Sequence, residues 1–180
     1  MSLHICTAFL MVGFLVPQTT HSQMYLTKEG ALNLHFAQSD SIERRTLYLT
    51  EQEISAIEQR AKAIVDSRVV TYYVGHAAEE ITGYAFLERQ TVRTMPVVYM
   101  VVLNPDTTVR AVEILAFHEP EDYLPTGRWL AQFEGTVLDD DLWLKRGIQN
   151  VVGATLSART LTQGVRRVLA LFEVAVAGGD

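Results

Sequence analysis

Near the start of the chain, apolar residues recur at the spacing of α-helices. Residues 28–37 follow Thr27 and carry Ala31, Leu32, Leu34 and Phe36, which predicts a short helix. A better-defined helix follows, because Thr50 and Glu53 are spaced as in a capping box. Apolar residues then recur every three or four positions (Ile54, Ile57, Ala61 and Ile64). The stripe that they form predicts a helix that covers one face of a sheet.

From residue 69 the period changes to that of β-strands. Residues 69–74 and 81–87 are rich in β-branched and aromatic side chains and predict a hairpin. Two further runs, 96–103 and 109–117, are joined by Asn104-Pro105-Asp106, a turn composition. Four consecutive strands with short links favour an antiparallel meander over βαβ units.

The last third returns to helical periodicity. Residues 124–135 predict a second helical segment, 138–145 a polar linker and 147–152 a last extended piece. The terminal run 158–174 is amphipathic, with one apolar face (Leu161, Val165, Val168, Leu169 and Phe172). The pattern therefore predicts an α+β fold, in which an antiparallel meander packs with N-terminal and C-terminal helices. We expect a domain at 69–180, with a helical segment at 23–68 packed on it.

Composition narrows the class of protein. With 180 residues, 48% of them hydrophobic, the chain can build one globular core. The formal net charge of −6 and the absence of any block of basic residues argue against a nucleic-acid partner, because the phosphates would not be neutralised.

Residues 1–22 resemble a signal peptide. An apolar stretch at 5–16 is too short to span a bilayer and is followed by a polar segment that ends at Ser22. We therefore expect export, although no Lys or Arg precedes the stretch, and a mis-assigned start codon or a buried N-terminal helix is the alternative. Cys6 is the only cysteine. A cleaved chain would lack thiolate chemistry, so redox chemistry would need an organic cofactor or a metal site without sulfur.

The segment Gly153-Ala154-Thr155-Leu156-Ser157 directly precedes the terminal amphipathic run. A helix N-terminus presents unpaired N–H groups and positive potential, so a phosphate near Thr155 would be stabilised there. The small residues Gly153 and Ala154 allow a bulky group to approach the backbone. The alternative is that Thr155 or Ser157 simply caps the helix.

Several motifs occur in a fixed order before this segment. They are Gly83-Tyr84-Ala85 in a strand, the hairpin at 97–117, the turn Phe117-His118-Glu119-Pro120, the Gln132-Phe133-Glu134-Gly135 helix end and finally Thr155. In this order they resemble the FMN-binding domain family. That family includes the C subunit of the sodium-pumping NADH:quinone reductase and the G subunit of its ferredoxin-linked relative. The resemblance covers residues 69–174.

The resemblance implies that FMN is esterified to Thr155 by a separate flavin transferase, which uses FAD and Mg²⁺. It also implies that Glu119 orients the flavin ring or its ribityl hydroxyls, with His118 nearby. The remaining expected cofactor contacts are Gly153, Ala154, Leu156 and Ser157. Such a chain is an electron carrier that works with membrane or periplasmic redox partners, rather than a stand-alone enzyme.

Some positions depart from the family pattern. Gln149 and Val152 stand where the family has an aspartate and a serine or threonine, and residues 120–124 replace its Thr-Pro-Gly-Leu-Gly turn. These departures leave a second hypothesis open, in which the same scaffold is a non-redox binding module. Ser157 is an alternative acceptor.

Two charged segments have alternative interpretations. Lys145 and Arg146 could pair with a flavin phosphate or simply lie at the surface. Three consecutive acids, Asp139-Asp140-Asp141, suggest a solvated turn more than a cation site, because the alternating spacing of a calcium loop is missing.

Overall fold

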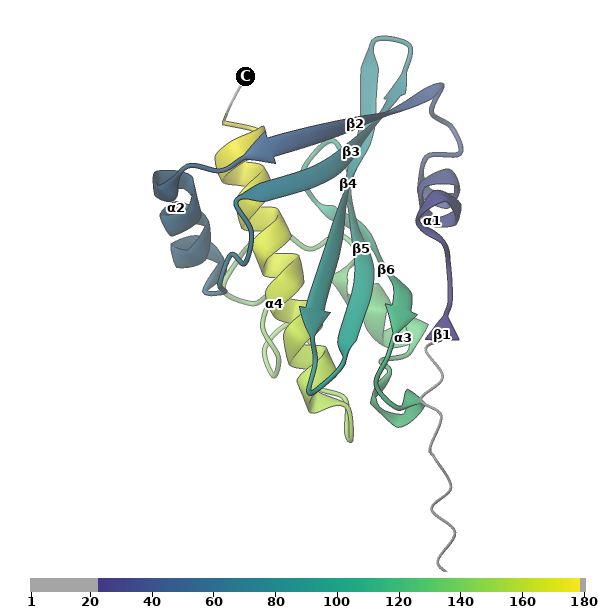
Figure 1. Cartoon of the computed structure of the whole chain (residues 1–180), viewed down its shortest axis with the longest axis vertical. Helices are drawn as coiled ribbons and strands as arrows, with labels where there is room; N and C mark the ends of the chain where they lie inside the picture. The colour runs from purple at the N-terminus through teal and green to yellow at the C-terminus, as the bar shows by residue number, and fades with distance from the viewer. Residues whose placement is uncertain (1–22, 179–180) are drawn as a thin grey trace, which may run out of the picture.

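The computed structural model describes residues 23–178, which fold around a six-stranded antiparallel sheet (Figure 1). Five of the strands follow one another as a meander, and the N-terminal strand pairs at one edge. In spatial order the strands are β1 (Gln23–Met24), β6 (Val109–Phe117), β5 (Pro96–Leu103), β4 (Glu80–Thr91), β3 (Val69–Ala77) and β2 (Ser41–Tyr48). The predicted α+β fold with an antiparallel meander is confirmed.

Helices cover both faces of the sheet. α4 (Thr155–Leu171) crosses one face diagonally, and α2 (Glu51–Ala61) packs beside it. α4 ends in one π-helical turn, η3 (Phe172–Val176). The short α1 (Lys28–His35) lies on the opposite face (Figure 1). None of the helices within residues 23–178 is long and apolar enough to cross a membrane.

The two faces have cores of different size. Under α4 and α2 the larger core includes fully buried side chains from the sheet and the helices (Ile57, Val74, Phe86, Tyr99, Phe117, Leu161, Val165 and Leu169). Under α1 the smaller core is built from a few residues (Ala31, Leu32, Phe36, Met100, Val102 and Leu115). Most of the apolar burial therefore fixes α4, the helix whose first turn carries Thr155.

The predicted helix starts are confirmed. The Thr27 hydroxyl accepts the N–H of Gly30 at 3.0 Å, which caps α1. At α2 both bonds of the capping box form: Glu53 N–H donates to the Thr50 hydroxyl, and Thr50 N–H donates to Glu53 Oε2 at 2.7 Å.

Two strands lie in residues 23–68, for which the sequence predicted only helices. β1 pairs with β6, and all eight residues of β2 pair with β3. β2 carries Glu43, Arg44 and Arg45 and has no clear alternation of buried and exposed positions. It forms the outer edge of the sheet, where neither face is deeply buried, so the period-2 pattern that identifies strands is absent.

Other predicted elements also differ. Residues 147–152 form no strand, apart from one parallel bridge between Leu144 and Ile148. The predicted helix at 124–135 is divided into α3 (Gly127–Leu130) and the 3-10 turn η2 (Ala131–Phe133). The predicted signal peptide, with Cys6, lies outside the described residues.

A buried arginine holds the segment before α4 in place. Arg166 is 2% exposed, and its guanidinium stacks on Trp143 with the cation 4.2 Å from the ring centre. It donates to the carbonyls of Ala61 at 3.0 Å and Asp139 at 2.6 Å. α2, α4 and the loop around residue 140 are therefore joined at one point.

α4 also lies unusually close to the sheet at Gly164. A Cβ at this position would lie 1.6 Å from the hydroxyl of Tyr99, which belongs to β5. Glycine in a helix interior costs about 1 kcal/mol relative to alanine, and here it allows a large buried side chain to reach the helix backbone.

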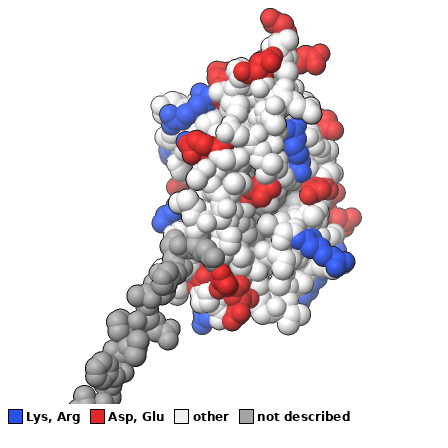
Figure 2. All heavy atoms as spheres, turned by 90° about the vertical axis from the view of Figure 1, so that its right-hand side faces the viewer, with Lys and Arg blue, Asp and Glu red and all other residues white. Residues whose placement is uncertain are grey.

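Charge on the face that carries α1 is dispersed. Figure 2 shows separate acidic and basic side chains among uncharged ones on this face. The described residues of this face thus form no continuous basic surface.

Candidate cofactor site

The first turn of α4 has no side-chain cap. Ala154 is the N-cap residue and Thr155 the first helical residue, so the alternative that Thr155 or Ser157 caps the helix is wrong. The main-chain N–H groups of Thr155, Leu156 and Ser157 meet no acceptor within residues 23–178. Free N–H groups together with the helix dipole favour an anion at this point.

The Thr155 side chain is half-buried and turned toward the preceding loop. Its hydroxyl donates to the carbonyl of Val151 at 3.3 Å and accepts from Asn150 Nδ2 at 3.1 Å. Neither partner is titratable, so no residue within 23–178 places a base within hydrogen-bonding distance of the hydroxyl.

A hollow of about 160 Å³ adjoins this first turn. All five residues of the segment singled out in the sequence line it (Gly153, Ala154, Thr155, Leu156 and Ser157). Gly153 has φ +85°, a left-handed conformation that favours glycine, and open space lies where its Cβ would be. The other walls are Val92 and Arg93 from the β4–β5 turn and Tyr123 from η1 (Glu121–Tyr123).

Ser157 has a structural contact. Its side chain is fully buried, and its hydroxyl donates to the carbonyl of Tyr123 at 2.5 Å. This bond attaches η1 to α4 and engages the hydroxyl that was the alternative acceptor.

Glu119 organises the opposite wall of the hollow. It is 8% exposed, and its Oε1 accepts the N–H groups of Arg93 at 3.1 Å, Thr94 at 2.6 Å and Met95 at 2.8 Å. Burial raises the pKa of Glu119, but the hydrogen bonds from Thr94, Met95 and Arg93 outweigh it and hold the pKa below its ordinary value. Glu119 thus fixes the β4–β5 turn and does not line the hollow itself.

His118 also acts away from the hollow. Its Nδ1 lies 3.0 Å from the carbonyl oxygen of Pro96, so this nitrogen carries the hydrogen, and its main-chain N–H donates to the same oxygen at 3.2 Å. The side chain is half-buried. His118 and Glu119 therefore contact the β4–β5 turn and the start of β5, and neither lines the hollow.

The stability that Glu119 contributes is expected to depend on pH. Because its folded pKa is lower than its ordinary value of 4.5, the contribution is present above that value and is lost as the pH falls through the folded pKa. Between pH of about 6 and about 3, wild type should lose on the order of 1 kcal/mol more stability than Glu119→Gln. Urea unfolding at several pH values measures the difference, and parallel curves would contradict it.

Arg93 is a candidate that sequence reasoning missed. It lines the hollow, its side chain is exposed, and its guanidinium has no hydrogen bond or ion pair with any described residue. The predicted phosphate partners Lys145 and Arg146 are exposed and do not line the hollow. The sequence places Arg93 in the link between two predicted strands, but only the fold brings this link beside the start of α4.

The segment before Thr155 is held by the helix end that contributed to the family resemblance. Trp129 Nε1 donates to the carbonyl of Gln149 at 2.6 Å, and Gln149 N–H donates to Gln132 Oε1 at 2.8 Å. The side chain of Gln149 is exposed, and Val152 is 97% exposed. Gln149 and Val152, two of the positions that depart from the family pattern, therefore lie at the surface in the segment that leads to Thr155.

The acidic run at 139–141 forms a turn. Asp139 Oδ1 accepts the N–H groups of Asp141 and Leu142, both at 2.9 Å. Within residues 23–178 no group of three or more His, Cys, Asp or Glu side chains is placed to hold a metal ion.

Comparison of the sequence with protein-family models found no matching family, and comparison with curated proteins found no matching relative.

Proposed function

We propose that this chain is an exported electron-transfer flavoprotein that carries FMN esterified to Thr155. The observation that carries the proposal is the hollow at the start of α4, which is lined by Thr155, by two other residues whose main-chain N–H groups have no acceptor within residues 23–178, and by Arg93, whose guanidinium has no partner there either. These are the groups that bind a phosphate. FMN, once attached, supplies one- and two-electron redox chemistry.

The dimensions of the hollow suit one part of the cofactor. A volume of about 160 Å³ accepts a phosphate and the adjoining chain, but it is smaller than pockets that enclose whole cofactors, about 300–1,000 Å³. The remainder would extend to the surface, where Val152 is 97% and Leu156 47% exposed. Exposed apolar side chains beside the attachment point support electron exchange with a docking partner, here membrane or periplasmic redox proteins.

The attachment step requires a second enzyme. The Thr155 oxygen would form a bond to the FMN phosphorus of FAD, the bond from that phosphorus to the bridging oxygen of the pyrophosphate would break, and AMP would leave with the bridging oxygen. The proton of Thr155 must pass to a base on the flavin transferase, because Asn150 and the Val151 carbonyl are not bases. In this step the chain positions the hydroxyl and neutralises the phosphate.

Co-expression with a flavin transferase tests the proposal. Intact-mass measurement of the denatured protein should show the addition of one FMN, and the pure protein should be yellow. An unmodified, colourless protein would favour the second candidate, a non-redox binding module, which Gln149 and Val152 support because they replace family residues near the acceptor.

The residue types of the family pattern can be introduced at positions 149 and 152 at little cost in stability, because both side chains are exposed. We expect Gln149→Asp with Val152→Thr to increase the modified fraction several-fold in a time course with limiting transferase. Surface substitutions of this kind change stability little. The matched control is Gln149→Asn with Val152→Ala, and equal rates for the two double variants would show that these positions do not govern modification.

A further inference from the structure

The sheet splits between β3 and β4. Their pairing stops at Tyr72 and Phe86, although β4 continues to Thr91 with β5 as its partner, and β3 begins at Val69 with β2 as its partner. The two strands diverge from this point (Figure 1). The last five residues of β4 therefore have a strand on one side only.

The direction of the main-chain groups along this free edge follows from the ladder. Val92 N–H donates to the carbonyl of Met95 at 3.1 Å, so even-numbered residues of β4 bond to β5. Arg89 and Thr91 direct their N–H and C=O groups to the other side, into the split. No hydrogen bond to these groups is found among residues 23–178.

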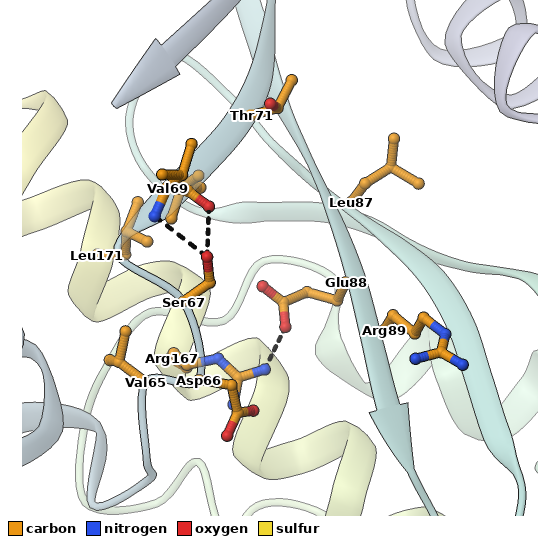
Figure 3. A pocket seen from close by; sticks show the side chains of 11 residues that line it. Val65, Asp66, Ser67, Val69, Thr71, Leu87, Glu88, Arg89, Arg167 and Leu171 are labelled. Atoms are coloured by element: carbon orange, nitrogen blue, oxygen red, sulfur yellow. Dashed lines mark hydrogen bonds and ion pairs between the residues drawn. The ribbon is translucent and has the colours of Figure 1, made fainter. Parts of the chain in front are cut away.

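On the β3 side of the split, the main-chain groups of Val69 already have a hydrogen-bond partner. The Ser67 hydroxyl donates to the carbonyl of Val69 at 2.9 Å and accepts its N–H at 3.1 Å (Figure 3). One side chain thus satisfies both groups of Val69 that face the split. Arg89 and Thr91 have no comparable partner among the described residues, so β4 presents the open edge.

A groove runs beside this edge. It encloses about 700 Å³ between residues 89–91 of β4, the loop that follows α2 and the side of α4. A second hollow of about 210 Å³ continues toward Val69 (Figure 3). The groove side chains are mainly polar (Lys62, Asp66, Gln90, Thr160, Gln163 and Arg167).

A buried ion pair forms the floor. Arg167, 7% exposed, donates from α4 to Glu88 of β4 (Figure 3). It also donates to the carbonyl of Ile64 at 3.1 Å. Arg167 therefore links the three walls of the groove, which are α4, β4 and the loop that follows α2.

We propose that an extended, polar segment of a partner protein adds to the free edge of β4 at Arg89 and Thr91 and lies in this groove. Main-chain donors and acceptors repeated at every second residue match the backbone of another strand. Polar walls, with Lys62 and Asp66 both present, match polar side chains on the segment better than large apolar ones. This inference does not depend on FMN.

Peptides selected from a displayed library of random 12-residue sequences on the full chain provide the test. We expect selected peptides to bind wild type and Arg89→Ala with similar affinity, and Arg89→Pro at least tenfold more weakly. Proline removes the N–H that faces the split without breaking a bond to β5, because Arg89 does not bond to β5, whereas alanine truncates the same side chain and keeps this donor. Thermal melting checks that the proline variant is folded.

Amide hydrogen exchange of the wild-type chain gives a second test that needs no variant. The amides of Arg89 and Thr91 should exchange faster than that of Gln90, and a selected peptide should protect them. An empty selection, peptides that bind Arg89→Pro unchanged, or unprotected amides would overturn the proposal. A dimer that depends on this edge would overturn it in favour of a second copy.

Discussion

Replacement of Thr155 with alanine is expected to abolish covalent attachment of FMN. The hydroxyl of Thr155 is the acceptor in the proposed reaction, and the neighbouring Ser157 hydroxyl is buried and engaged by Tyr123. The variant loses two hydrogen bonds, at 3.1 and 3.3 Å, so its stability should fall by no more than about 2 kcal/mol. Intact mass after co-expression with a flavin transferase measures the loss.

Two matched variants distinguish a missing acceptor from a disturbed helix. Thr155→Ser keeps a hydroxyl at the same point and should be modified, while Ser157→Ala should keep the FMN because Thr155 is unchanged. Modification of Thr155→Ala, or loss of FMN only in Ser157→Ala, would place the acceptor elsewhere and refute the assignment.

Truncation of Glu88 to alanine is expected to destabilise the fold by about 3–5 kcal/mol. The side chain of Glu88 is 14% exposed and that of Arg167 8% exposed, so the variant leaves a buried guanidinium without its counter-charge. Burial raises the pKa of Glu88 and Arg167 opposes that rise, as expected for a carboxylate removed from water beside a cation. Urea denaturation monitored by circular dichroism gives the free energy of unfolding.

Removal of both charges separates electrostatics from packing. Glu88→Leu with Arg167→Met replaces the pair by apolar side chains, and such replacements of buried ion pairs are often neutral or stabilising. We therefore expect the double variant to be more stable than Glu88→Ala. If both unfold at the same urea concentration, the cost lies in packing or in the bond from Arg167 to Ile64.

The sequence could predict the meander and α4 because their patterns are strong. β3 to β6 are bounded by turn residues, and α4 has a continuous apolar face on the larger core. β2 could not be found in this way, because an edge strand with Glu43, Arg44 and Arg45 lacks alternation. Its position follows only from pairing with β3, a tertiary contact.

Part of the candidate site could likewise be predicted from the sequence, and part could not. Residues 153–157 are contiguous, so their composition was enough to single them out. The other wall depends on the position of the β4–β5 turn, through which Arg93 reaches the hollow. Glu119, expected to orient the cofactor, accepts three main-chain N–H groups of that turn. A carboxylate that accepts main-chain N–H groups has no sequence signature that separates it from one that faces a ligand.

The hollow brings together segments that are far apart along the chain. Arg93 and Thr155 are separated by 62 positions, and Tyr123 lies between them. Such an assembly exists only after β4, β5 and α4 have packed, so a newly made or translocating polypeptide offers no complete recognition surface to a modifying enzyme. Modification at Thr155 would therefore follow folding, and the modified chains would be those that have already reached their native state.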